Sequence, residues 1–155
     1  MRACEDVSPL RSNVLLCDDE HELTDVLATQ LENLGHLVTV ARSCADTFAH
    51  ACSHDYDALV IAPFLRDGSA LVLPRALGIR RPRLVVLVSR LTDRLAQAVA
   101  RRVGFDAQLT KIVDAKVLDR LVRTSILAGL EAQQAVAETL ESPPPASEVG
   151  ARRPR

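Results

Sequence analysis

The chain has 155 residues, of which 48% are hydrophobic and 25% are charged, and its formal net charge is -1. This length accommodates one domain with a single core and a short tail, and it excludes a second globular domain. The composition is that of an ordinary globular protein, which excludes a disordered or fibrous chain, and the net charge alone indicates no particular partner.

Charge is unevenly distributed along the chain. Residues 1–65 carry 3 basic and 11 acidic side chains, whereas residues 66–102 carry 9 basic and 2 acidic ones. Residues 103–155 are balanced, with 7 basic and 7 acidic side chains. No stretch approaches the roughly 20 apolar residues of a membrane-spanning helix, and the polar N-terminal segment is unlike a secretory signal. We therefore expect a cytoplasmic protein without a membrane partner, whose cysteines stay reduced and form no disulfide or metal site.

Short apolar runs alternate with longer helical patterns, which is typical of βαβ units on a parallel sheet. Three of the runs are almost wholly apolar, as strands covered on both faces must be, and these belong at the centre of the sheet. The expected strands are Val14–Cys17, Leu37–Ala41, Ala58–Ala62, Leu84–Val88 and Ala107–Leu109.

The first helical pattern covers Glu20–Leu34 and is followed by Gly35, a residue suited to ending a helix in the left-handed conformation. Its apolar residues recur at spacings of three and four, which predicts one buried stripe. The stripe consists of Leu23, Leu27, Leu31 and Leu34. The second helix is capped by Ser43 or Asp46. Its expected apolar side includes Phe48, Ala49 and Cys52.

Three further helices are expected. The third, Ser69–Leu77, contains Pro74, which cannot donate an intrahelical hydrogen bond and should shorten or bend it. The fourth covers Thr92–Val103. The fifth follows a cap at Asp114, continues to about Leu140 and is longer than one strand requires. Its apolar positions are Val117, Leu118, Leu121, Val122, Ile126, Leu127 and Leu130.

These elements predict an α/β fold, a doubly wound five-stranded parallel sheet of order 2-1-3-4-5, in a flavodoxin-like three-layer sandwich with an extended C-terminal helix. The expected domain covers residues 13–128, and residues 129–140 extend the last helix. We expect residues 1–12 to be flexible and residues 141–155 to be disordered, because the tail is rich in proline and poor in apolar side chains.

Asp18, Asp19 and Glu20 follow the first expected strand. Adjacent carboxylates repel one another, so the group would gain from a hard cation such as Mg²⁺. A second interpretation is that Asp19 or Glu20 caps the first helix, whose N-terminal dipole favours an anion. The local sequence leaves both interpretations open.

Four segments occur in a distinctive order: NVLLCDDEHEL, YDALVIAPFLRDG, LVVLVS and GFDAQLTK. In order and spacing they resemble the segments of bacterial response-regulator receiver domains, over residues 13–128. In the family that the chain resembles, an aspartate at the end of the third strand accepts a phosphoryl group from a histidine kinase. In that family, this aspartate and the acidic pair after the first strand together hold Mg²⁺.

The position that matches the acceptor aspartate is Ala62. A methyl group neither attacks phosphorus nor ligates a metal, so the nucleophile and one of three carboxylates are absent together. Asp67 matches the family's loop aspartate, and Asp57 lies at the opposite end of the strand. Neither is expected to replace the acceptor. We expect no metal site, and leave open only a weak residual Mg²⁺ site at Asp18 and Asp19.

Other positions of the family's site are partly retained. The resemblance assigns Ser89 to the hydroxyl that binds the phosphoryl group and Lys111 to the lysine that offsets its charge. Without a phosphoryl group, we expect Lys111 to pair with Asp18 or Asp19. Gln108 and Ile112 stand where the family usually has an aromatic residue and a proline, so the parts of the switch have diverged together.

We therefore expect a stand-alone, phosphorylation-independent pseudo-receiver, with no enzymatic activity and no cofactor, that acts as a protein-protein interaction module in bacterial signalling. Its expected partners are signalling proteins, namely a kinase, a regulator or a scaffold, or a second copy of the chain bound through the last helix. The expected partner-binding residues are Leu118, Val122, Ile126, Leu130, Arg94 and Arg101.

Two alternatives remain open. The first is a receiver that accepts a phosphoryl group on a displaced carboxylate such as Asp19 or Asp67. The second is an arginine-rich nucleotide or nucleic-acid binder, which the basic residues 66–102 suggest. Only 3% of the chain is aromatic and no DNA-reading helix pair is evident, so we do not expect a nucleic-acid partner.

Overall fold

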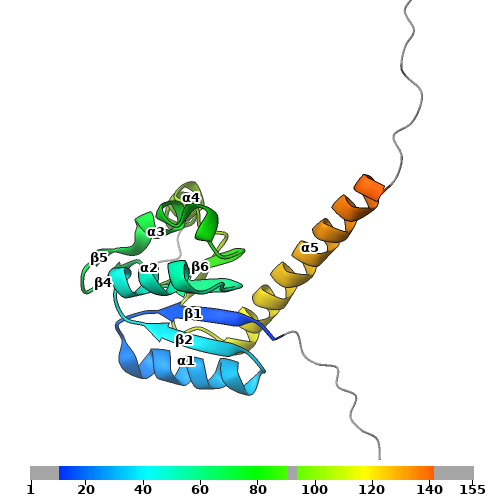
Figure 1. Ribbon diagram of the computed structural model, residues 1–155. Helices are drawn as coiled ribbons and strands as arrows, with labels where there is room; N and C mark the ends of the chain where they lie inside the picture. Colours follow the sequence, from blue (N-terminus) through cyan, green and yellow to red (C-terminus); the bar gives the residue numbers. More distant parts are fainter. Residues whose placement is uncertain (1–10, 91–93, 142–155) are drawn as a thin grey trace, which may run out of the picture.

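The computed structural model describes residues 11–90 and 94–141, which form a three-layer α/β sandwich (Figure 1). The five strands of its parallel sheet have the order β2-β1-β3-β6-β7. They are β1 (Asn13–Cys17), β2 (Leu37–Ala41), β3 (Ala58–Ile61), β6 (Leu84–Ser89) and β7 (Ala107–Thr110). The predicted strand order and fold class are confirmed, and each strand end lies within one residue of its prediction.

Helices cover both faces of the sheet. They are α1 (His21–Asn33), α2 (Cys44–Ser53), α3 (Leu73–Ala76), α4 (Arg94–Arg102) and α5 (Ala115–Glu141). Pro74 lies in the first turn of α3, which has only 4 residues and stands between two 3₁₀ turns, so the predicted shortening is confirmed. A small antiparallel hairpin, β4 (Phe64–Leu65) and β5 (Gly68–Ser69), follows β3.

Two hydrophobic cores lie on opposite sides of the sheet. Val14 and Leu16 of β1 face α1 and α5, whereas Leu15 and Cys17 of the same strand face α2, α3 and α4. All residues of β3 and β6 are buried, as expected for central parallel strands that are covered on both sides. The carboxyl ends of the strands meet at one edge of the sheet.

The buried face of α2 differs from the prediction. Phe48, Ala49 and Cys52 are all exposed, whereas Thr47 and Ala51 are buried against the sheet. Thr47 tolerates burial because its hydroxyl donates to the Ser43 carbonyl at 2.8 Å and contacts the Cys17 thiol. Hydrophobicity alone therefore identified the wrong face of this helix.

The fifth helix has two parts with different surroundings. Leu118 and Val122 are 0% and 1% exposed and belong to the core shared with α1, so their predicted role in binding a partner is wrong. The side chains of residues 131–140 are all exposed, and this half of α5 stands clear of the domain (Figure 1). The apolar stripe is continuous along the helix, but the sheet ends partway along it.

The N-terminal and C-terminal segments predicted to be flexible lie largely outside the described residues, at 1–10 and 142–155. Within the described ranges, no helix combines the length and hydrophobicity needed to cross a membrane.

The two parts of α5 should respond differently to truncation of a leucine. We expect Leu118→Ala to lower the free energy of unfolding by about 3 kcal/mol, because it leaves a cavity in the core. Leu130→Ala, at a side chain that is 48% exposed, should change it by less than about 1 kcal/mol. Urea unfolding followed by circular dichroism measures both, and equal losses would contradict the assignment of Leu118 to the core.

Candidate functional site

The candidate site lies at the carboxyl edge of the sheet, where four strand ends are linked by hydrogen bonds. The Ala62 amide donates to the Cys17 carbonyl at 3.0 Å, and the Lys111 amide donates to the Ser89 carbonyl at 3.1 Å. Lys111 then reaches across to Asp18, which follows Cys17. The structure therefore brings Asp18, Ala62, Ser89 and Lys111 together, as the sequence predicted.

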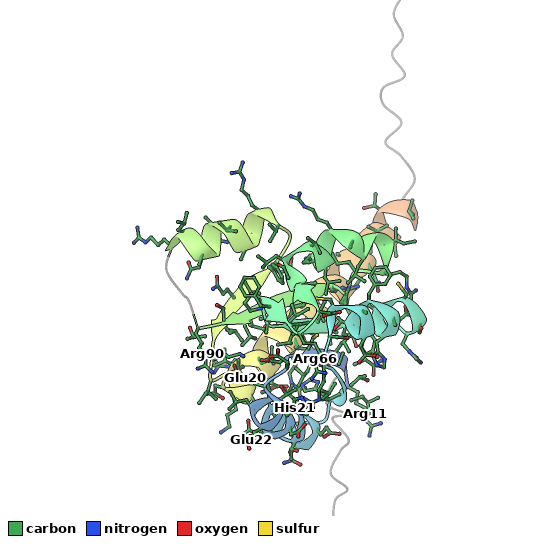
Figure 2. The ribbon with its side chains drawn as sticks, turned by 90° about the vertical axis from the view of Figure 1, so that its left-hand side faces the viewer. Arg11, Glu20, His21, Glu22, Arg66 and Arg90 are labelled. Carbon is green, nitrogen blue, oxygen red and sulfur yellow. The ribbon has the colours of Figure 1, made fainter. Side chains whose placement is uncertain are left out.

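An ion-pair network occupies this edge. Lys111 Nζ lies 2.7 Å from Asp18 Oδ2 and 2.7 Å from Glu20 Oε1, and Arg90 Nη2 donates to both Glu20 oxygens at 3.1 and 3.0 Å. Figure 2 shows Glu20 and Arg90 next to each other. The predicted pair of Lys111 with Asp18 is confirmed. Glu20, rather than the exposed Asp19, is the second carboxylate that binds Lys111.

The network is partly shielded from water, and this affects the charges of its members. The Lys111 side chain is only 9% exposed. Its burial would lower the pKa, but the hydrogen bonds with Asp18 and Glu20 outweigh that effect and raise the pKa above its usual value. The hydrogen bond from Lys111 in turn lowers the pKa of Glu20, with a smaller effect from Arg90. The network therefore favours charged side chains at neutral pH.

Ala62 belongs to the hydrophobic core rather than to a polar pocket. It is 4% exposed and shares a cluster with Leu65, which is 6% exposed, and with Ala70. The β4–β5 hairpin is held next to β3 by a 2.8 Å hydrogen bond from the Ala70 amide to the Pro63 carbonyl. Position 62 therefore lies in an apolar environment.

Asp67 has a structural role away from the ion-pair network. Its Oδ1 and Oδ2 accept hydrogen bonds from the Cys44 and Ala45 amides at 2.7 and 3.0 Å, at the N-terminus of α2. These bonds lower the pKa of Asp67, which keeps its carboxylate charged. Both oxygens are therefore engaged by the helix terminus, which disfavours Asp67 as a substitute acceptor.

The acidic residues do not fit a magnesium site. Asp18 Oδ1 accepts from the Glu20 amide at 3.0 Å, and Asp18 Oδ2 binds Lys111. In the ranges that the structure describes, no three His, Cys, Asp or Glu side chains are placed to hold a metal ion. The described residues therefore give no support to the predicted weak site at Asp18 and Asp19. Gln108 lies within β7 beside Leu87, away from the strand ends.

A second polar cluster, which sequence analysis did not identify, lies at the opposite edge of the sheet. His36 is buried between Ser12, which contacts its Nδ1, and Asp119, whose Oδ1 lies 2.6 Å from its Nε2. Arg123 donates to Asp119 at 2.8 Å and to the Leu34 carbonyl at 3.0 Å. Ser12 and His36 are only 1% and 2% exposed, so this serine-histidine-aspartate arrangement anchors α5 and is inaccessible to a substrate.

Several arginines of the basic segment are bound to their own chain. Arg80 pairs with Asp55 at 3.2 Å, and Arg81 pairs with Asp106 at 2.9 Å. Arg94 and Arg101, which were predicted to bind a partner, are exposed on α4. The segment is therefore divided among several elements, and this weakens the case for one nucleotide-binding cluster.

No protein-family model and no curated protein matches the chain. Among solved structures, the receiver domain of Francisella response regulator 1452 has a TM-score of 0.68 and 23% identity, covering 74% of this chain and 95% of that one. A receiver domain protein from Methanospirillum hungatei has a TM-score of 0.68 and 19% identity, covering 77% and 98%. A yeast Spc42 trimeric coiled-coil segment fused to another structure has a TM-score of 0.69 and 18% identity, covering 84% of this chain and 92% of that one. The chain therefore has the fold of response-regulator receiver domains.

The ion-pair network predicts a specific pH dependence of stability. The folded-state pKa of Glu20 lies below its ordinary value of 4.5, so its contribution is complete above that pH and is lost on acidification through the lowered value. We expect Glu20→Gln to flatten the dependence of the unfolding free energy on pH between about 5 and 3. Urea unfolding at several pH values measures the slope. The exposed Glu22→Gln is the control, and a slope in Glu20→Gln equal to that of the control would contradict the prediction.

Proposed function

We propose that this chain is a phosphorylation-independent pseudo-receiver that acts as a protein-protein interaction module in bacterial signal transduction, inside the cytoplasm and without catalytic activity. The observation that supports the proposal is the combination of an alanine at position 62 with a lysine that is already paired. Ala62 stands at the acceptor position and is buried in the same apolar cluster as Leu65, while Lys111 already binds two carboxylates. Alanine at position 62 supplies neither a nucleophile nor a metal ligand for phosphoryl transfer at that strand end.

The interaction surface is the α5 extension, which we define as residues 127–141. Leu130 and Leu140 are 48% and 79% exposed there, and Val136 is 58% exposed. Isolated helices of this length are marginal in water, and most helical stability in proteins comes from packing of an apolar face. The α5 extension therefore requires a partner to cover its apolar side.

The spacing of residues along α5 favours a second copy of the chain as one such partner. Ile126, Leu130, Gln133, Ala137 and Leu140 recur at alternating spacings of four and three. This alternation is typical of the seam of a coiled coil.

A small phosphodonor tests the absence of phosphoryl transfer. We expect the natural chain, incubated with acetyl phosphate and Mg²⁺, to show no added phosphoryl group by intact-mass measurement. The Ala62→Asp chain is the informative comparison, because neighbouring strands lie about 4.8 Å apart and the new carboxylate would stand beside Asp18. An adduct on the natural chain that disappears in Asp19→Asn or Asp67→Asn would establish a displaced acceptor and refute the proposal.

Light scattering tests the role of the α5 extension. We expect the full chain to self-associate at micromolar concentration, and a chain that ends at residue 126 to be monomeric, because the truncated chain keeps Leu118 and Val122 in the core. Leu130→Glu should have the same effect as truncation. Ile79→Glu is the matched control, since Ile79 is 100% exposed and lies near α3. An unchanged number of chains per particle after truncation would count against the α5 extension as the interface.

A further inference from the structure

A cavity of about 500 Å³ lies between α1 and the segment that joins β7 to α5. Its floor includes Leu16, Val60 and Val88, strand residues that are only 2%, 3% and 5% exposed. One wall comes from the α1 leucines, and the opposite wall comes from residues 111–116. The cavity therefore passes between the helices and reaches the sheet itself.

The cavity exists because the described residues cover only part of the apolar stripe that was predicted for α1. Leu31 is fully buried, whereas Leu23, Leu27 and Leu34 are only half-buried and all line the cavity. On the other side, Ala115 contributes only a methyl group, and Ile112 is 76% exposed at the entrance rather than packed inside. Apolar surface that is expected to be buried thus faces an open space.

The charged groups that line the cavity balance one another. Asp18 is bound to Lys111, and Asp114 and Lys116 add one negative and one positive charge. Cys17 also lines the cavity, but its thiol contacts Thr47 of α2 on the other face of the sheet and adds no charge to it. The remaining polar side chains are uncharged hydrogen-bonding groups. They are Thr24, Gln30 and Asn33.

The geometry points to a binding site for a neutral, largely apolar small molecule that carries a hydrogen-bonding group for the amides of Gln30 and Asn33. The volume lies within the roughly 300–1,000 Å³ range of small-molecule sites. The depth favours a small molecule over a docking helix, because a helix resting on Val26 and Ile112 would not reach Val60 and Val88 on the floor. This ligand would bind independently of the α5 extension.

A neutral fluorophore tests this site in the full-length chain. We expect Prodan to bind saturably, with one molecule per chain and a blue-shifted emission. Leu27→Trp, which fills the cavity from α1, should weaken binding by about tenfold, and Ile112→Glu, which places a charge at the entrance, should also weaken it. The matched controls are Leu95→Trp and Ile79→Glu, because Leu95 and Ile79 are 73% and 100% exposed and do not line the cavity.

Several results would overturn the inference. Ile112→Glu changes an exposed side chain and is expected to fold, so unchanged Prodan affinity in this variant is decisive even if Leu27→Trp fails to fold. Non-saturable binding to the natural chain would also refute the site. Tighter binding of the anionic fluorophore anilinonaphthalene sulfonate than of Prodan would refute a neutral ligand. Binding only after removal of residues 1–10 and 142–155 would show that the chain covers the cavity itself.

Discussion

The contact of Lys111 with Asp18 and Glu20 is the interaction on which the rest of the site depends. A lysine side chain that is only 9% exposed requires anionic partners for its ammonium group, and both lie 2.7 Å away. The contact joins the end of β1 to the end of β7, and Arg90 extends it to the end of β6 through Glu20. A third carboxylate at position 62 would compete for the same cation and would require a metal ion to offset its charge. Alanine at this position leaves the lysine and the acidic residues balanced.

The residues around position 62 have structural roles. Ala62 shares an apolar cluster with Leu65 and Ala70, and Asp67 binds the N-terminus of α2. The features that these roles do not account for lie on the helices. These are the α5 extension, with its exposed apolar side chains, and the cavity beside α1. We therefore propose that function resides on helical surfaces rather than at the strand ends.

Sequence predicted the sheet well because apolar runs and helical periodicity are local properties. It failed where a side chain's environment depends on distant residues. His36 is bound by Ser12 and Asp119, which are 24 and 83 positions away in sequence, and no local pattern reveals that cluster. Thr47 is buried because of its hydrogen bonds, which hydrophobicity does not register. Leu118 and Leu130 share one stripe, and only the position of the sheet distinguishes a core residue from an exposed one.

A double-mutant cycle between Lys111 and Asp18 tests the central claim most directly. It compares the unfolding free energies of the natural chain, Lys111→Met, Asp18→Asn and the double variant, each with and without millimolar Mg²⁺. Our account predicts a coupling energy of about 2 kcal/mol that Mg²⁺ leaves unchanged, because the partly buried ion pair already occupies the site. A coupling energy near zero, or a natural chain that Mg²⁺ stabilises at the expense of the ion pair, would contradict it.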